Sequence, residues 1–390
     1  MFLLGLLLFV GLVLVHEFGH FVVARRSGVK VNEFGLGLPP RARAIRLRSG
    51  MLLSLNWLPL GGFVKLKGEY DADTTPGSFG SKNTWVKTKI LLAGVTMNFL
   101  VGVGILTFLA ATGLPKIFTA DAVGQEQFTV KNDTKIARQV VYAGYIVPGS
   151  PAKQIGLSNQ DQILSVSNGS LTKSVNSELS LHDATAGFAG QEVSVTYLRH
   201  GKQQSKTARL LSAAEVKASQ NTNNPKGYLG LEPYELQVRK STWSAPIVAL
   251  GFTKQLIQLT FVGLWHALQG LGSTIAGLAT GNRAARVAGQ TAASSQVGGP
   301  VAIMDVLWNS GNLGINFMLL IIAVISLTLA VMNILPIPAL DGGRLFVILL
   351  THSFRKKLSR GSEELIHGTG MAVLLSLILL ITIVDVRRFF

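Results

Sequence analysis

The chain has 390 residues, of which 48% are hydrophobic and only 14% are charged, a balance too apolar for an ordinary soluble protein. It contains no cysteine, which excludes disulfides and thiolate chemistry. Lys and Arg number 36 against 20 Asp and Glu, but these cations cluster beside apolar runs, as in the cytoplasmic loops of membrane proteins. Basic and aromatic residues do not interleave, so we expect no nucleic-acid partner.

Four apolar runs are long enough to cross a hydrocarbon core of ~30 Å, which takes about 20 helical residues. We expect them to form transmembrane helices. The first is not read as a cleaved signal peptide, because no cation precedes Arg25 and no small-residue cleavage site follows the apolar core. The N-terminus is therefore expected outside the cell and Arg25 inside it. The runs are Phe2 to Ala24, Ile90 to Ala111, Ile315 to Leu335 and Ile366 to Val384.

A fifth run, Ala245 to Leu268, is ambiguous because it contains Lys254, Gln258 and His266. Counting crossings helps to place it. With four spans, the polar residues at the end of the first run and those after the third lie near the same face of the membrane, and one added crossing would separate them. We therefore expect Ala245 to Leu268 to form an interfacial or bundle-packed helix.

A polar stretch between the second and third spans, residues 113–240, predicts a compact α+β domain outside the membrane. Its alternating segments Gln162 to Ser170 and Glu192 to Gly201 are typical of strands that end in turns. A short helix is expected after Ser150, which would cap it, with Pro151 at its first position.

A smaller β element is expected on the cytoplasmic side of the membrane. The stretch "NWLPLGGFVKLKGE", Asn56 to Glu69, carries a Leu-Gly-Gly bend, and polar and apolar residues then alternate from Phe63 to Lys67. This alternation predicts a strand.

The second half of the first apolar run contains "HEFGH", which places two histidines and a glutamate at membrane depth. Positions i and i+4 of a helix share one face, so His16 and His20 can coordinate one metal ion, while Glu17 can reach a water bound to that ion. This H-E-x-x-H spacing is that of zinc metalloproteases, in which the glutamate is the general base. The alternative is a helix bundle in which the three side chains bond to neighbouring Asn or Thr groups.

A catalytic zinc takes three protein ligands, so a third ligand is expected at similar depth. The stretch "MNILPIPALDGGRL" follows the third apolar run, and its Asp341 is the only acid between Asp305 and Glu363. Pro336 and Pro338 are expected to break the helix there, and the two glycines after Asp341 allow close backbone approach. Irregular backbone at membrane depth persists only beside protein or a water-filled cavity.

These paired motifs resemble the site-two protease family of intramembrane zinc metalloproteases, and most closely the bacterial regulator-of-sigma-E protease type. The resemblance extends to "GLGLPPR" and "PLGGFVKLKGE" in the cytoplasmic loop and hairpin of that family, and to its PDZ domain in "YIVPGSPAKQIGLSNQDQILSVSNGS". The segment Gly298 to Val306, "GGPVAIMDV", is similar to the one before its third span.

The resemblance implies a role for each matching residue. His16, His20 and Asp341 would be zinc ligands and Glu17 the catalytic base. Asn333 would help to hold the substrate backbone, although a helix-to-helix hydrogen bond is its alternative. The hairpin residues Phe63, Val64, Lys65 and Leu66 would pair with an unwound substrate.

Two departures from the family pattern stand out. Val95 takes the place of a common proline in the second-span motif, which puts any special role for Gly94 and Asn98 in doubt. The outer domain, residues 113–240, has room for one PDZ unit rather than two. Such a domain can bind peptide termini by strand addition or restrict entry to the site.

The expected fold is a polytopic α-helical membrane protein of about four transmembrane helices, with a cytoplasmic membrane-associated β-hairpin and one extracytoplasmic PDZ-like α+β domain. It would lie in the cytoplasmic (inner) membrane. The expected segments are a first transmembrane helix (1–24), a cytoplasmic loop with the hairpin (25–89), a second helix (90–112), the PDZ-like domain (113–240), linking or interfacial helices (241–314), a third helix with the aspartate motif (315–343), a cytoplasmic loop (344–365), and a fourth helix with the C-terminus (366–390).

The expected activity is that of an intramembrane zinc endopeptidase. Its expected partners are the lipid bilayer, single-span proteins such as anti-sigma factors or remnant signal peptides as substrates, and peptide ligands of the PDZ domain. One alternative is a catalytically silent PDZ-containing membrane adaptor or chaperone, which the intact motifs disfavour. Another is an ion transporter, which also needs an intramembrane acid, but the chain lacks inverted-repeat hydropathy.

Overall fold

The computed structural model describes residues 2–69, 73–118, 124–220, 225–284, 304, 307–308, 314–355 and 358–389. Of the segment Gly298 to Val306, only Met304 is among them. The chain divides into two compact units, which we describe separately. Unit 1 comprises Met1–Leu109 and Pro246–Phe390, and unit 2 comprises Ala110–Ala245.

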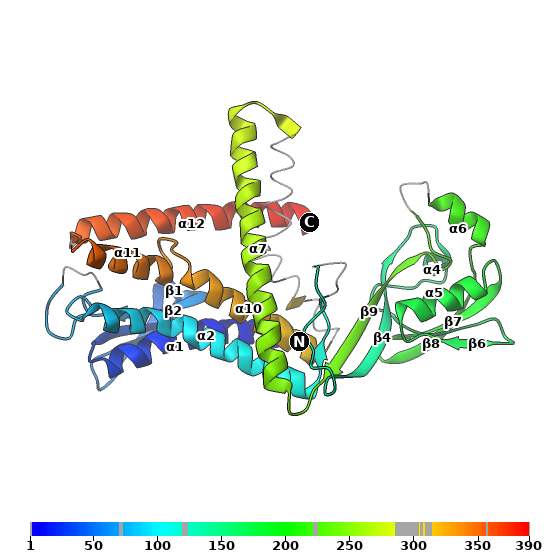
Figure 1. Ribbon diagram of the computed structural model, residues 1–390, viewed down its shortest axis with the longest axis horizontal. Coiled ribbons are helices and arrows are strands. Elements are labelled where there is room, and N and C mark those ends of the chain that lie inside the picture. The colour runs from blue at the N-terminus through cyan, green and yellow to red at the C-terminus, as the bar shows by residue number, and fades with distance from the viewer. Residues whose placement is uncertain are drawn as a thin grey trace. The chain divides into compact units, whose positions relative to one another are not determined.

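Three long helices form the centre of unit 1 (Figure 1): α1 (Phe2–Arg26), α2 (Thr84–Thr112) and α10 (Ile315–Ile334). Helices α1 and α10 run parallel, since Gly5 approaches Met318 and Leu12 packs with Ile322. The remaining helices of this unit are α7 (Ala245–Ala279), α11 (Asp341–Ser353) and α12 (Arg360–Phe389).

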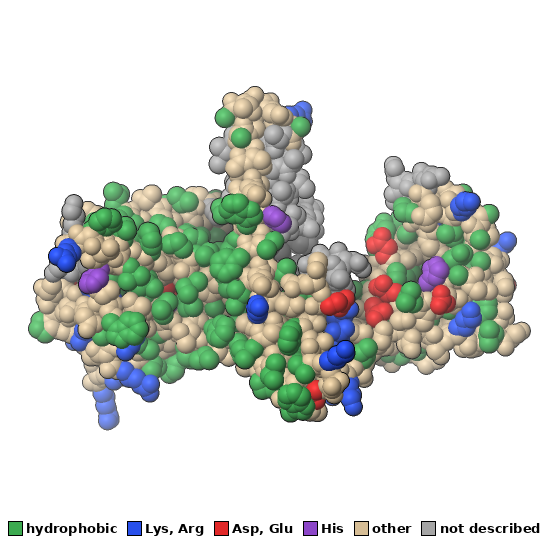
Figure 2. Space-filling model, in the orientation of Figure 1, with side chains coloured by type: hydrophobic (Ala, Val, Ile, Leu, Met, Phe, Trp, Pro, Cys, Tyr) green, Lys and Arg blue, Asp and Glu red, His purple; other side chains and the backbone are tan. Residues whose placement is uncertain are grey.

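Four helices in the described parts of the chain are long and apolar enough to cross a membrane: Phe2–Arg26, Thr84–Thr112, Ala245–Thr274 and Ile315–Ile334. Hydrophobic side chains are spread over the visible face of unit 1, whereas Asp and Glu are visible chiefly on unit 2 (Figure 2). The prediction of a polytopic membrane protein is therefore supported. The fourth expected span, Ile366 to Val384, lies inside α12 and stays a prediction.

Helix α7 is longer than expected, and by length and composition it can cross a membrane. The parallel course of α1 and α10 constrains the alternatives. Because parallel helices enter the membrane from the same face, an even number of crossings must separate the end of α2 from the start of α10. Helix α7 therefore either stays on one side or is followed by a return crossing, and its interfacial placement stays a prediction.

Several helices have other bounds than the segments expected from the sequence. Helix α2 begins at Thr84 rather than at residue 90, because the Asn83 side chain accepts a hydrogen bond from the Val86 amide and caps it. The stretch expected as a cytoplasmic loop, residues 344–365, is mostly helical, since α11 covers Asp341–Ser353 and α12 begins at Arg360. Asp341 is consequently the first residue of a new helix and not the end of the third span.

The cytoplasmic β element is larger than the sequence indicated. Strands β1 (Val31–Arg46) and β2 (Leu52–Leu66) are joined at residues 47–51. The Leu-Gly-Gly bend is therefore not the hairpin turn. It is an irregularity inside β2, where the register passes from the Leu38–Leu58 pair to the Leu36–Gly62 pair. Gly61 has φ +84 there, a conformation that favours glycine.

Strand β1 pairs with β2 twice. Residues 33–36 have Cα partners in 62–65 and also in 52–55, while residues 41–46 pair with 52–56. A strand has only two edges, so four segments lie side by side in the order 62–66, 31–36, 52–56 and 41–46. Among the described residues, the segment 62–66 has no second strand partner and forms one edge of this sheet.

Unit 2 is built around a sheet in the order β3-β9-β4-β5-β7-β8, with β6 paired to β5. The predicted strands at Gln162 and Glu192 are confirmed, as is the predicted short helix, α4, whose cap Ser150 accepts a hydrogen bond from the Lys153 amide. The bounds are β3 (Leu114–Pro115), β4 (Lys135–Ile146), α4 (Pro151–Gln154), β5 (Gln162–Ser167), β6 (Thr172–Ser174), α5 (Glu178–Gly187), β7 (Glu192–Arg199), β8 (Lys202–Arg209), α6 (Ala213–Ser219) and β9 (Leu231–Lys240).

Candidate metal centre

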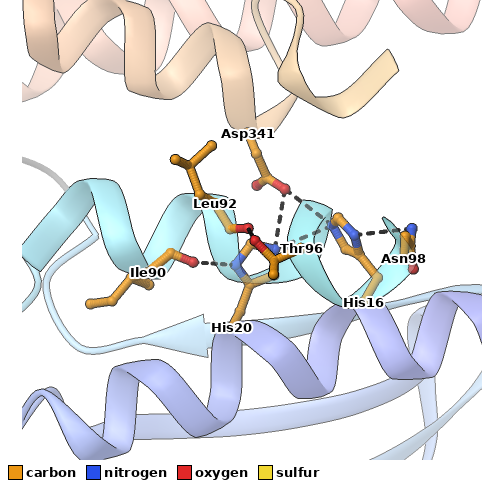
Figure 3. Close-up of polar contacts among 7 residues, drawn as sticks. All are labelled: His16, His20, Ile90, Leu92, Thr96, Asn98 and Asp341. Carbon is orange, nitrogen blue, oxygen red and sulfur yellow. Dashed lines mark hydrogen bonds and ion pairs between the residues drawn. The ribbon is translucent and has the colours of Figure 1, made fainter. Parts of the chain in front are cut away.

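The structure brings together the three residues that the sequence proposed as ligands. The Nε2 atoms of His16 and His20 are 3.2 Å apart, and Oδ2 of Asp341 lies 3.1 Å from each (Figure 3). Within the part of the chain that the structure describes, this is the only group of three or more His, Cys, Asp or Glu residues with atoms placed to share a metal ion. The residues come from α1 and from the first turn of α11, so the third side chain reaches the site through tertiary packing.

The donor set fits zinc. A tetrahedral zinc with bonds of ~2.0–2.1 Å keeps its ligand atoms about 3.3 Å apart, close to the observed 3.1–3.2 Å. Two imidazoles and one carboxylate leave a fourth position for water or substrate, which is the ligand count of a catalytic site. The side chains of His16 and His20 are each 10% exposed and that of Asp341 is 21% exposed, so the aspartate is the most accessible of the three.

The ring orientation of His20 is set by a carbonyl group. Its Nδ1 donates a hydrogen bond of 2.8 Å to the backbone oxygen of Ile90 on α2. The proton is thereby held on Nδ1, and the lone pair of Nε2 points to His16 and Asp341. A hydrogen-bond acceptor for the second ring nitrogen is typical of metal-binding histidines, because it fixes the tautomer that a metal requires.

His16 has a corresponding partner in Asn98, which is 1% exposed. The Nδ2 atom of Asn98 lies 3.3 Å from Nδ1 of His16, and Oδ1 has no hydrogen-bond partner among the described residues. Turning the amide by 180° would place Oδ1 against an Nδ1–H group and leave Nε2 free for metal. The chemistry of metal binding therefore favours the turned amide.

Two glycines let α2 approach the ligands closely. A Cβ at Gly94 would lie 2.4 Å from Nε2 of His20 and 2.7 Å from Nε2 of His16, and a Cβ at Gly19 would lie 2.6 Å from the Ala93 oxygen. Neither position can hold a larger residue without displacing a neighbour. The sequence left Gly94 and Asn98 in doubt because of Val95, yet both contact the ligands, and their i, i+4 spacing on α2 was the available signal.

Asp341 is positioned by the broken chain before it. Helix α10 ends at Ile334, and residues 335–340 form a turn in which Ala339 has φ +84. A Cβ at Gly342 would lie 2.3 Å from the Ile334 oxygen, and one at Gly343 would lie 2.0 Å from the Ile337 oxygen. The predicted close backbone approach at these glycines is therefore confirmed, and it packs the first turn of α11 against the end of α10.

Glu17 lies beside the ligands without belonging to the group. It is half-buried, the Cβ position of Gly62 lies 3.4 Å from its Cγ, and the backbone of Val64 lies near its carboxylate. The side chain is therefore placed between α1 and the edge segment 62–66. A carboxylate there can exchange a proton with a water or amine at the site.

The remaining predicted residues lie close to this region in different settings. Asn333 is half-buried near the end of α10, and its side chain forms no hydrogen bond with any other described residue, so the helix-to-helix bond considered as its alternative is not observed. In the edge segment, the Leu66 amide donates to the Glu69 side chain at 2.8 Å. Residues of one strand point alternately to either edge, so Val64, like Leu66, directs its amide away from β1. Phe63, Val64 and Lys65 pair with residues 33–35, and Leu66 pairs with Val31.

Comparisons with known proteins agree with this chemistry. The sequence model of Peptidase family M50 matches residues 4–377. A Clostridium perfringens protein named "Putative zinc metalloprotease" is 28% identical over 98% of this chain and 97% of its own length. A Fusobacterium nucleatum protein of the same description is 28% identical, over 100% and 97%. The Enterococcus faecalis "Probable protease eep" is 25% identical over 97% of both chains.

Proposed function

Because this chain belongs to peptidase family M50 and is a zinc metalloprotease, we propose that it cuts single-span membrane proteins inside the bilayer. The depth of the ligand group carries the proposal. At a rise of 1.5 Å per residue, His16 lies about 15 Å and His20 about 9 Å along α1 from Arg26. In a hydrocarbon core of ~30 Å, these positions are within the membrane.

His16, His20 and Asp341 would hold the zinc ion in this proposal. When bound, zinc supplies Lewis-acid chemistry to the scissile carbonyl and lowers the pKa of water at the site towards ~7. Glu17 takes a proton as water adds to the carbonyl carbon, and it returns that proton to the departing amide nitrogen as the C–N bond breaks. The half-buried Asn333 offers an amide that can bind the substrate backbone.

The edge segment 62–66 would hold the substrate as an added strand. Its Val64 amide points away from β1 and towards Glu17, so a paired substrate backbone would pass beside the catalytic carboxylate. A helical substrate must unwind first, because its peptide groups already bond to one another. Substrates with helix-destabilising residues near the cytoplasmic face are expected to be cut fastest. Equal cleavage of a poly-leucine span would contradict this step.

We further propose that unit 2 is a PDZ-like domain on the outer side of the cytoplasmic membrane. Among the described residues, 231–236 of β9 pair only with β4, and helix α5 borders β9, where the Glu178 amide donates to Glu235. This unpaired edge suits a peptide bound by strand addition.

Since the chain has no cysteine, single cysteines introduced at Ser49 and Ser158 can report on which side of the membrane each unit lies. Labelling of intact cells at Ser158 but not at Ser49 is expected, and the reverse pattern would contradict the topology.

Cleavage of a panel of pre-trimmed single-span substrates in liposomes tests the proposal, with products identified by mass spectrometry. Wild type is compared with Glu17→Gln and with Glu192→Gln, a control on the exposed surface of β7. Cuts within the span that vanish only in Glu17→Gln are expected. Cuts that persist in Glu17→Gln would remove Glu17 from the mechanism. Absence of both cleavage and stoichiometric zinc would favour the silent adaptor.

A further inference from the structure

A groove of about 470 Å³ runs along the outside of the contact between α1 and α2. Its walls are mainly apolar, with Phe18 and Val22 on α1 facing Leu92 and Met97 on α2. The volume lies within the ~300–1000 Å³ typical of ligand pockets. The groove is separate from the metal centre, because His16, His20 and Asp341 do not line it.

The groove lies between two helices that are expected to be surrounded by lipid. Both helices that form it are long and apolar enough to cross the membrane. Phe18 is 49% exposed and Trp85, at the cytoplasmic end, is 66% exposed. Tryptophan at such a position is typical of the level of lipid headgroups.

Two cations stand at the same end of the groove. Arg26 ends α1 and Lys89 lies in the second turn of α2, and both line the groove. Neither pairs with a carboxylate in the described part of the chain, although the Lys89 ammonium lies 5.3 Å from the Trp85 ring centre. Arg25, the neighbour of Arg26, does not line the groove, and its guanidinium lies over Phe21.

We propose that this groove binds one anionic phospholipid, with its phosphate at Arg26 and Lys89 and one acyl chain between α1 and α2. An apolar slot that ends in two cations without carboxylate partners complements such a lipid in both shape and charge. The floor of the slot includes Gly19 and Ala93, next to the Gly94 that packs on both histidines. The bound chain therefore packs against the helix contact that carries two of the metal ligands.

Quenching of Trp85 fluorescence tests this site. The full-length protein, with its other four tryptophans changed to Phe, is reconstituted in phosphatidylcholine. Small fractions of chain-brominated phosphatidylglycerol or chain-brominated phosphatidylcholine are then added. At about 1 kcal/mol per cation near the headgroup, the two cations predict half-quenching at a roughly thirtyfold lower fraction of the anionic lipid. The Arg26→Gln/Lys89→Gln variant is expected to lose this preference, and the matched Arg25→Gln variant to keep it.

Three results would overturn the proposal. Equal quenching by the two lipids would mean that ordinary bulk lipid fills the groove. A preference that survives Arg26→Gln/Lys89→Gln would place the anionic lipid elsewhere. Protection of Trp85 from both lipids would mean that a helix occupies the groove. Native mass spectrometry of the wild-type protein, which needs no substitution, should independently show one retained phosphatidylglycerol in preference to phosphatidylcholine, and its absence would also contradict the site.

Discussion

The contact between Asn98 and His16 gives the sharpest test of the metal centre. We predict that Asn98→Leu weakens zinc binding, because it removes the side chain that holds Nδ1 of His16. Asn98 is 1% exposed, and it is the residue within hydrogen-bonding distance of that nitrogen, at 3.3 Å. Leucine is close in size, so the helix contact should be largely retained while the hydrogen bond is lost.

The expected loss of zinc affinity follows from the role of residues that hydrogen-bond to metal ligands. Removing one typically costs 10–100-fold in metal affinity, which corresponds to about 1.4–2.7 kcal/mol. Asn98→Asp should cost much less than Asn98→Leu, because a carboxylate also accepts a hydrogen bond from the Nδ1–H group of His16. This difference follows from the turned amide orientation, in which Asn98 is an acceptor rather than a donor.

Zinc affinity can be measured by competition with a chromophoric chelator on the purified protein in detergent. Thr96→Val serves as a matched control on the same helix, since Thr96 is exposed and its hydroxyl bonds to the Leu92 oxygen of its own helix. Wild-type affinity in Asn98→Leu would refute the proposed role of the contact. An equal loss in Asn98→Asp and Asn98→Leu would refute the amide orientation.

Three further predictions concern packing and pH. Gly94→Ala should abolish stoichiometric zinc in metal analysis, because its Cβ would lie 2.4 Å from Nε2 of His20, whereas Gly104→Ala, with open space around it, should retain zinc. Gly343→Ala should reduce zinc content and cleavage together by moving Asp341, since its Cβ would overlap the Ile337 oxygen, and normal zinc content would contradict this. Hydrogen bonds from the Ser244 and Thr242 hydroxyls lower the pKa of Asp133 from 3.8 to about 2. Its contribution to stability is therefore present above pH 3.8 and lost as pH falls through about 2, so the melting temperature of Asp133→Asn should depend less on pH in this window than that of wild type, and parallel curves would contradict the assignment.

Local sequence was informative wherever the chemistry depends on neighbours along one helix. The four-residue spacing of His16 and His20 places both rings on one face whatever surrounds the helix. Asp341 was identifiable because a lone acid beside an apolar run needs a compensating partner. The cap at Ser150 was also predictable, because a helix cap depends only on residues within one turn of the chain.

Local sequence was misleading where an element depends on packing between distant segments. Residues 344–353 were expected in a loop, yet they belong to α11, whose first turn is held by the contacts of Gly342 with the end of α10 and of Gly343 with Ile337. The second pairing of residues 33–36 with 52–55 was also not predictable. Register between strands is set by side-chain packing and by turn geometry, and the Leu-Gly-Gly stretch could equally have been the turn.

By itself, the sequence determined that this is a membrane protein with a candidate metal-binding pair on its first helix and an acid after its third apolar run. Only the tertiary structure decided that Asp341 lies 3.1 Å from both histidines, that Ile90 and Asn98 hold the two rings, and that the edge segment 62–66 borders Glu17. The physical reason is that covalent spacing along a helix fixes i, i+4 neighbours, whereas contacts across more than 300 residues depend on which helix faces can approach. That approach depends on the absence of a Cβ at Gly19, Gly94, Gly342 and Gly343, which becomes evident only when the opposing atoms are in place.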